Sequence, residues 1–138
     1  MVSLGVAALR TAQAALPGPL AAFTAKTFGD AVSALGGVGG ALVPSPLVTL
    51  DVPAVADNGA FVPVTVASAL PGTREILLLV EGNPQPVAAS FIIPAGTEAF
   101  VATRIRMAAS GTVHAAVRTD EGVFAAMRSV QVALGGCA

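Results

Sequence analysis

The spacing of apolar residues changes near residue 44 of this 138-residue chain. Before that point the apolar residues recur at intervals close to the helical period, at Leu20, Phe23, Phe28, Val32 and Leu35. Gly36 and Gly37 follow them as a helix stop, and further glycines and prolines come next. This pattern predicts that residues 1–43 form an N-terminal helical segment and a glycine-rich linker.

After residue 44 the apolar spacing shifts toward two, which is the period of a β-strand. Alternating or continuously apolar segments cover 47–53, 61–66, 75–82, 90–94, 98–107, 112–118 and 123–134. Turns rich in Gly, Pro, Asn and Asp separate them, and TDEG at 119–122 is typical of a hairpin connection. The pattern predicts an all-β domain over 44–134, an antiparallel β-sandwich of about seven strands.

Local features of these segments add detail to the predicted sandwich. Pro63 has no backbone N–H, which places its strand at an edge or a bulge. The apolar parity of the last strand slips at Arg128–Ser129, which predicts a β-bulge. The runs Ile76–Val80 and Phe91–Ile93 do not alternate, so both faces of their sheet must be covered. The helical segment can cover part of one sheet, and we expect a second chain to cover the rest.

The composition also favours a partner, since 54% of the residues are hydrophobic and only 11% are charged. A formal net charge of −1 gives no basis for binding nucleic acid or an anionic membrane. The longest uncharged run, Ala31 to Leu50, contains glycines and prolines that would break a membrane-spanning helix. We therefore expect an obligate heterodimer. The isolated chain is expected to aggregate or to form homodimers, including Cys137–Cys137 disulfides.

Few side chains are available for catalysis, because the chain has one histidine and one cysteine. They are too few for a zinc site, so we expect no catalytic and no metal-binding residues. His114 lies in the middle of a predicted strand, and we interpret it as a solvated or interface residue. An enzyme that pairs Cys137 with His114 is an alternative, and it requires the two side chains within hydrogen-bond reach.

The single cysteine, Cys137, follows Gly135 and Gly136 beyond the end of the last predicted strand. The glycines permit backbone angles closed to other residues, and three extended residues carry the thiol roughly 10 Å beyond the sheet. These features predict a flexible C-terminal carrier arm over 135–138, with the two glycines as its hinge. An incidental cysteine on a frayed tail explains the same residues equally well.

Four segments together resemble one family. LDVPAVADNGAFVPVTV at 50–66, EGNPQPVAASFIIP at 81–94, ATRIRM at 102–107 and the terminal GGC are similar to SoxY, the sulfur-carrier subunit of the bacterial thiosulfate-oxidising Sox system. The resemblance extends over roughly residues 47 to 137. It implies that the sandwich is immunoglobulin-like and that the protein is a carrier rather than an enzyme, with no cofactor other than a sulfur intermediate bound covalently to Cys137.

The resemblance also implies partners and a location. The expected partners are a SoxZ-like β-protein in a heterodimer, a c-type cytochrome complex, a sulfate-releasing hydrolase and, in many organisms, a sulfane dehydrogenase. Periplasmic location is implied by the family, although Arg10 stands alone and no twin-arginine motif is present. The tail departs from the usual GGCGG, since Cys137 is followed by Ala138.

Four further residues match the resemblance. Asn83 and Pro84 correspond to the family's turn, and we predict a structural role for them. Arg104 and Arg106 share an outward strand face, where they either pair with carboxylates of a partner or are solvated. The alternative function from another class is a structural or adhesive immunoglobulin-like module in which Cys137 is incidental.

Overall fold

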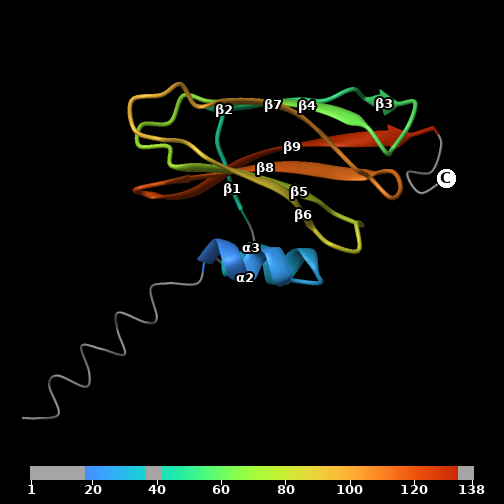
Figure 1. Cartoon of the computed structure of the whole chain (residues 1–138), viewed down its shortest axis with the longest axis horizontal. Helices are drawn as coiled ribbons and strands as arrows, with labels where there is room; N and C mark the ends of the chain where they lie inside the picture. The colour runs from blue at the N-terminus through green and yellow to red at the C-terminus, as the bar shows by residue number, and fades with distance from the viewer. Residues whose placement is uncertain (1–17, 37–41, 134–138) are drawn as a thin grey trace, which may run out of the picture.

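The computed structural model describes residues 18–36 and 42–133, and Figure 1 shows how their elements are arranged. In chain order the elements are α2 (Gly18–Thr24), α3 (Phe28–Ala34), β1 (Val43–Pro44), β2 (Val48–Asp51), β3 (Val55–Ala56), β4 (Val62–Ser68), β5 (Glu75–Val80), β6 (Val87–Ile92), β7 (Phe100–Ile105), β8 (Gly111–Thr119) and β9 (Gly122–Val132). Each of the seven segments predicted as strands contains one. The fourth of them corresponds to β6, which begins three residues earlier than the apolar run alone predicts.

The described residues form three layers. One sheet has the strand order β1-β9-β8-β5-β6, with β3 also paired to β9, and the other has the order β2-β4-β7. The two sheets face each other, and the helices lie against the outer face of the larger sheet (Figure 1). The larger sheet is therefore the middle layer of the molecule.

Strand β5 is buried on both of its faces. Every residue from Ile76 to Val80 is 0% exposed. Ile76, Leu78 and Val80 pack between the two sheets, whereas Leu77 and Leu79 pack under the helices. The two-sided cover predicted for this run is confirmed. The expectation that a second chain must supply part of the cover is wrong for Ile76–Val80, because the chain covers both faces itself.

The predicted helical segment consists of two short helices in its described part. Thr27 has an extended backbone, and its side chain accepts a hydrogen bond from the Asp30 N–H at 3.1 Å, so it is the N-cap of α3. A residue that caps a new helix cannot continue the previous one, so α2 ends at Thr24. Gly36 has a φ of +88° and ends α3, as the sequence predicts. At the end of the predicted linker, Val43 begins strand β1, whereas residues 1–17 and 37–41 lie outside the described residues.

The predicted bulge in the last strand is wrong. Pairing between β8 and β9 runs without a shift from Thr119↔Gly122 to Gly111↔Val130. The apolar residues of β9 do not keep to one face, because different parts of the strand are covered on different faces. Ala125 is buried on the helix-facing side, whereas Val130 is buried in the core between the sheets. The register irregularity of this sheet lies instead between β5 and β6, at Leu78/Leu79.

Pro63 lies in the middle strand of the smaller sheet, but at a place where that strand has one neighbour. It pairs with Arg104 of β7, while the β2 pairings begin further on, at Thr65. The predicted edge or bulge position is therefore wrong for the strand, which is the middle one of its sheet. Proline is tolerated here because β2 does not extend as far as Pro63.

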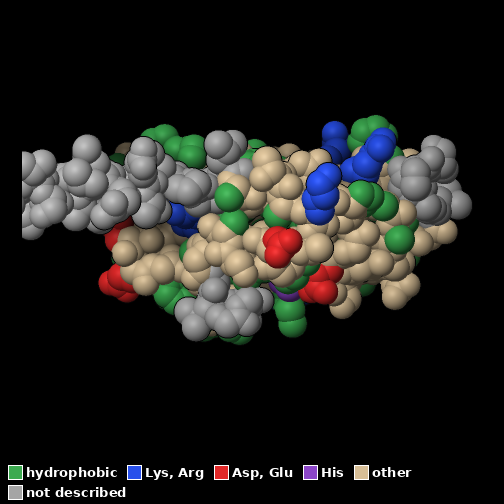
Figure 2. All heavy atoms as spheres, turned by 90° about the horizontal axis from the view of Figure 1, so that it is seen from below, with side chains coloured by type: hydrophobic (Ala, Val, Ile, Leu, Met, Phe, Trp, Pro, Cys, Tyr) green, Lys and Arg blue, Asp and Glu red, His purple; other side chains and the backbone are tan. Residues whose placement is uncertain are grey.

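The surface carries scattered apolar side chains. Among the described residues, large hydrophobic side chains that are exposed are Val43, Leu47, Val55, Phe61, Ile92, Phe100 and Met127. Figure 2, which shows the molecule from the helix side, has acidic and basic groups separated by uncharged surface. No helix within the described ranges is both long enough and apolar enough to span a membrane.

Candidate functional site

The predicted arm residues Gly135, Gly136 and Cys137 lie outside the described residues. The structure describes the root of the arm, which is the end of β9 at Val132 together with Ala133. We call this end of the sandwich the arm end. The loops after β3, between β5 and β6, and between β7 and β8 also lie there (Figure 1).

One side of the arm root is held by β3. This strand pairs in parallel with β9, with Val55 beside Gln131 and Ala56 beside Val132. The Gln131 N–H donates to the Ala54 carbonyl at 2.8 Å, and the Ala133 N–H donates to the Ala56 carbonyl at 2.9 Å. Within the described residues, the last main-chain bond beside β9 is the one that Ala133 makes, two residues before the predicted arm.

Ser110 holds the other side of the root. Its hydroxyl accepts a hydrogen bond from the Val132 N–H at 2.8 Å and lies 3.4 Å from Oε1 of Gln131. At Gly111, the next residue, an added Cβ would lie 2.6 Å from the Glu81 carbonyl oxygen, so glycine allows β8 to approach the β5–β6 loop closely. Gly111 is visible in the sequence as part of the predicted ASG turn. Strand β3 is not, because two residues are too few to show a period.

Asn83 joins two loops of the arm end. Its Nδ2 donates to the Arg106 carbonyl at 2.7 Å, and its Oδ1 accepts from the Ala108 N–H at 2.9 Å. The Met107 N–H donates to the Gly59 carbonyl at 2.7 Å, which ties the loop after β3 to the same place. The structural role predicted for Asn83 is confirmed, because one amide satisfies a donor and an acceptor of a neighbouring loop.

An Asn83→Ala substitution should lower the free energy of unfolding by about 1–3 kcal/mol, because it removes two hydrogen bonds and leaves their main-chain partners unpaired. Urea denaturation measures this loss. Gln85→Ala is the matched control, since Gln85 lies in the same loop and makes one exposed bond, to the Phe23 carbonyl. It should cost at most about 1 kcal/mol. Equal losses in the two variants would contradict the bridging role.

His114 was predicted as a solvated or interface residue, and the solvated alternative is wrong because the side chain is buried within this chain. It is 7% exposed, because its strand lies under α3 and the Phe28 ring packs against the imidazole with centroids 4.5 Å apart. Its Nε2 lies 2.7 Å from Oε1 of Glu81. An apolar cavity of about 310 Å³ borders the ring, lined also by Phe28 and Met127. Since Phe28 and Glu81 already engage the ring, these contacts favour a structural role for His114.

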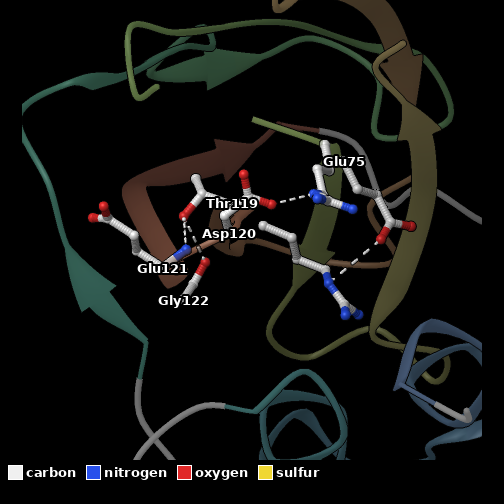
Figure 3. A network of polar contacts seen from close by, with 7 residues as sticks. Glu75, Thr119, Asp120, Glu121 and Gly122 are labelled. Atoms are coloured by element: carbon white, nitrogen blue, oxygen red, sulfur yellow. Dashed lines mark hydrogen bonds and ion pairs between the residues drawn. The ribbon is translucent and has the colours of Figure 1, made fainter. Parts of the chain in front are cut away.

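The opposite end of the sandwich carries a polar network, shown in Figure 3. Asp120, in the β8–β9 turn, pairs with Arg74. Buried Glu75 accepts a hydrogen bond from Ser90 at 2.6 Å and lies 3.7 Å from Nε of Arg118. The predicted TDEG turn is confirmed. A hollow of about 790 Å³ lies beside these residues, away from the arm root, and its two arginines and two carboxylates balance in charge.

The outward placement predicted for Arg104 and Arg106 is confirmed. Both side chains are exposed, while the neighbouring Ile105 and Met107 are buried in the core. Arg104 pairs with Pro63 across β4 and β7, at the arm end of the smaller sheet.

Comparison with known proteins relates this architecture to one family. The family model of sulfur oxidation protein SoxY matches residues 34–137. Among solved structures, the sulfur carrier protein SoxY from Chlorobium limicola f thiosulfatophilum is 34% identical, with a TM-score of 0.68, and the match covers 80% of this chain and 96% of that chain. No curated protein matches the chain.

A second solved structure is similar in fold alone. Superoxide reductase (neelaredoxin) from Ignicoccus hospitalis is 18% identical with a TM-score of 0.55, over 62% of this chain and 79% of that chain. The predicted immunoglobulin-like sandwich with a helical segment is confirmed by the match to the Chlorobium protein. Because the family model covers most of the chain and a solved member, 34% identical, matches 80% of it, this chain belongs to the SoxY family of sulfur oxidation proteins.

Proposed function

We propose that this protein carries sulfur intermediates of thiosulfate oxidation covalently on Cys137, with Gly135 and Gly136 as the hinge of the arm. The observation that supports this most is the match to a solved sulfur carrier over 80% of the chain. The family match itself extends to residue 137 and so includes the GGC sequence. The anchored root fits the role, because a carrier arm needs a fixed base from which to extend.

The loading step that we propose joins the Cys137 sulfur to the terminal sulfur of thiosulfate. The thiol loses its proton, a sulfur–sulfur bond forms, and two electrons pass to a c-type cytochrome complex that acts as the oxidant. The product is a cysteine S-thiosulfonate. Hydrolysis of its bond to the sulfonate group then releases sulfate, takes up one water and leaves a persulfide on the arm. In both steps the catalytic groups belong to the partner, so this chain acts as the substrate scaffold.

A heterodimer with a SoxZ-like β-protein in the periplasm is part of the proposal. Exposed Phe100 supports a protein contact, because it lies on the outer face of the smaller sheet, at the opposite end of β7 from Arg104, and no other described element covers that face. Exposed Ile92, at the free edge strand β6, offers a second apolar contact. A sulfane dehydrogenase is the expected enzyme for oxidising the persulfide.

The test is intact-mass spectrometry after incubation with thiosulfate and the oxidising cytochrome complex. We expect a gain in neutral mass equal to the two sulfur and three oxygen atoms of thiosulfate. Peptide mapping should place it at Cys137. Thiosulfate without the oxidant is the control and should give no adduct, because the electrons then have no acceptor. An unchanged mass in the complete mixture would contradict the carrier function.

A further inference from the structure

We propose that four residues at the arm end of the smaller sheet form a docking patch for an acidic surface on the enzymes that load and unload the arm. The patch consists of Phe61, Pro63, Arg104 and Arg106, and we call it the arginine patch. This proposal rests on the proposed function, since it assigns a surface to the partners of that same arm.

The register of β4 and β7 brings these side chains together. Pro63 pairs directly with Arg104, and Val62 pairs with Ile105, so Phe61 lies opposite Arg106. Val62 and Ile105 point into the core, which turns their neighbours outward. Phe61 is 67% exposed. The two strands thus present an apolar pair beside a cationic pair.

The two arginines of the patch form no ion pair within the described part of the chain. The ion pairs among residues 18–36 and 42–133 involve Arg74, His114 and Arg118 as the basic partners, and neither patch arginine takes part. Arginine beside an aromatic side chain is the composition that protein interfaces favour. Two cations without carboxylates of their own fit a partner that supplies carboxylates.

The surface between these strands is hollowed. A shallow depression of about 520 Å³ is lined by Pro63 and Arg104 together with Thr65, Ala102 and Thr103. Its lining is small and uncharged apart from Arg104. A partner side chain can therefore enter beside the guanidinium without meeting a negative charge of this chain.

The patch is connected to the arm root through main-chain contacts. The Phe61 N–H donates to the Asn58 carbonyl at 3.2 Å, within the loop that follows β3, and β3 pairs with β9 at the root. The Arg106 carbonyl accepts the Asn83 bond described above. The patch and the root are therefore parts of one hydrogen-bonded end of the sandwich. An enzyme that docks on the patch therefore lies at the same end of the sandwich as the arm root.

The test measures docking without loading. All proteins carry Cys137→Ser. The affinity of the cytochrome complex for this protein is measured for the double variant Arg104→Glu/Arg106→Glu and for the single variant Arg128→Glu. Arg128 is the matched control, because it is exposed on β9 and lies outside the patch. The double variant should bind on the order of tenfold or more weakly at low salt, and high salt should reduce the difference. The control should bind like the unmodified background.

Two outcomes would overturn the patch. An unchanged affinity in the double variant would remove it as a docking surface. A failure of the double variant to assemble with the SoxZ-like protein, seen by size-exclusion chromatography, would assign the surface to the heterodimer contact instead. Both outcomes are independent of whether Cys137 accepts sulfur. If the protein docks through the patch but forms no adduct, the proposed function is contradicted while the docking patch still holds.

Discussion

A Cys137→Ser variant incubated with thiosulfate and the oxidising cytochrome complex should gain no mass. Serine keeps the size and polarity of the side chain, but its oxygen cannot form the sulfur–sulfur bond on which the proposed loading step depends. Since Cys137 is the only cysteine in the sequence, no other thiol can replace it. The expected effect is therefore complete loss of the adduct, measured by intact-mass spectrometry.

The folded state of this variant should match that of the unmodified protein. The substituted residue lies beyond Ala133, which makes the last main-chain bond beside β9 within the described residues, to Ala56. Thermal unfolding should thus give the same midpoint for both proteins. An adduct that persists in Cys137→Ser would place the sulfur on another residue. Sulfur oxidation that proceeds normally with the variant in its host would favour the alternative of a structural module with an incidental cysteine.

A Leu78→Ala substitution should cause the largest loss of stability, about 2–5 kcal/mol in the free energy of unfolding. Leu78 is 0% exposed and packs between the two sheets, where a truncated side chain leaves a cavity that neighbouring strands cannot close. Guanidinium denaturation measures the loss. Ile92→Ala is the control, because Ile92 is a similar apolar residue on the adjoining strand but is 72% exposed. It should cost less than about 1 kcal/mol. Equal losses would show that Leu78 is not part of a close-packed core.

The sequence predicted the strands well because each long strand has a period that burial imposes. In β7, Val101 and Ile105 face the core and Arg104 faces outward, so the alternation is visible without a structure. Continuous apolar character in β5 was equally informative, since only a strand covered on both faces can keep it. These signals depend only on residues close together in the chain, so they can be detected from the sequence.

Features that depend on distant pairing were missed. Strands β1 and β3 contain two residues each, too few to show a period, and both exist only because β9 lies beside them. The burial of His114 depends on the packing of α3 across the sheet, which the residues around the histidine do not encode. The candidate site also has a part that the sequence shows and a part that it does not. Cys137 was recognisable as a lone thiol behind glycines, whereas the hydrogen bond from the Val132 N–H to Ser110 at the arm root was not.

The anchoring of the arm root at Ala133 affects how quickly the proposed cargo can pass from one enzyme to the next. Cys137 is the fourth residue after Ala133, so under the proposed function its sulfur stays within roughly 15 Å of a fixed point, and its effective concentration there is on the order of 0.1 M. An active site that opens inside this radius meets its substrate at that concentration even if the two proteins hold each other weakly. Weak contacts dissociate quickly. A short tether on a rigid base therefore permits fast exchange of one cargo among successive enzymes without release into solution.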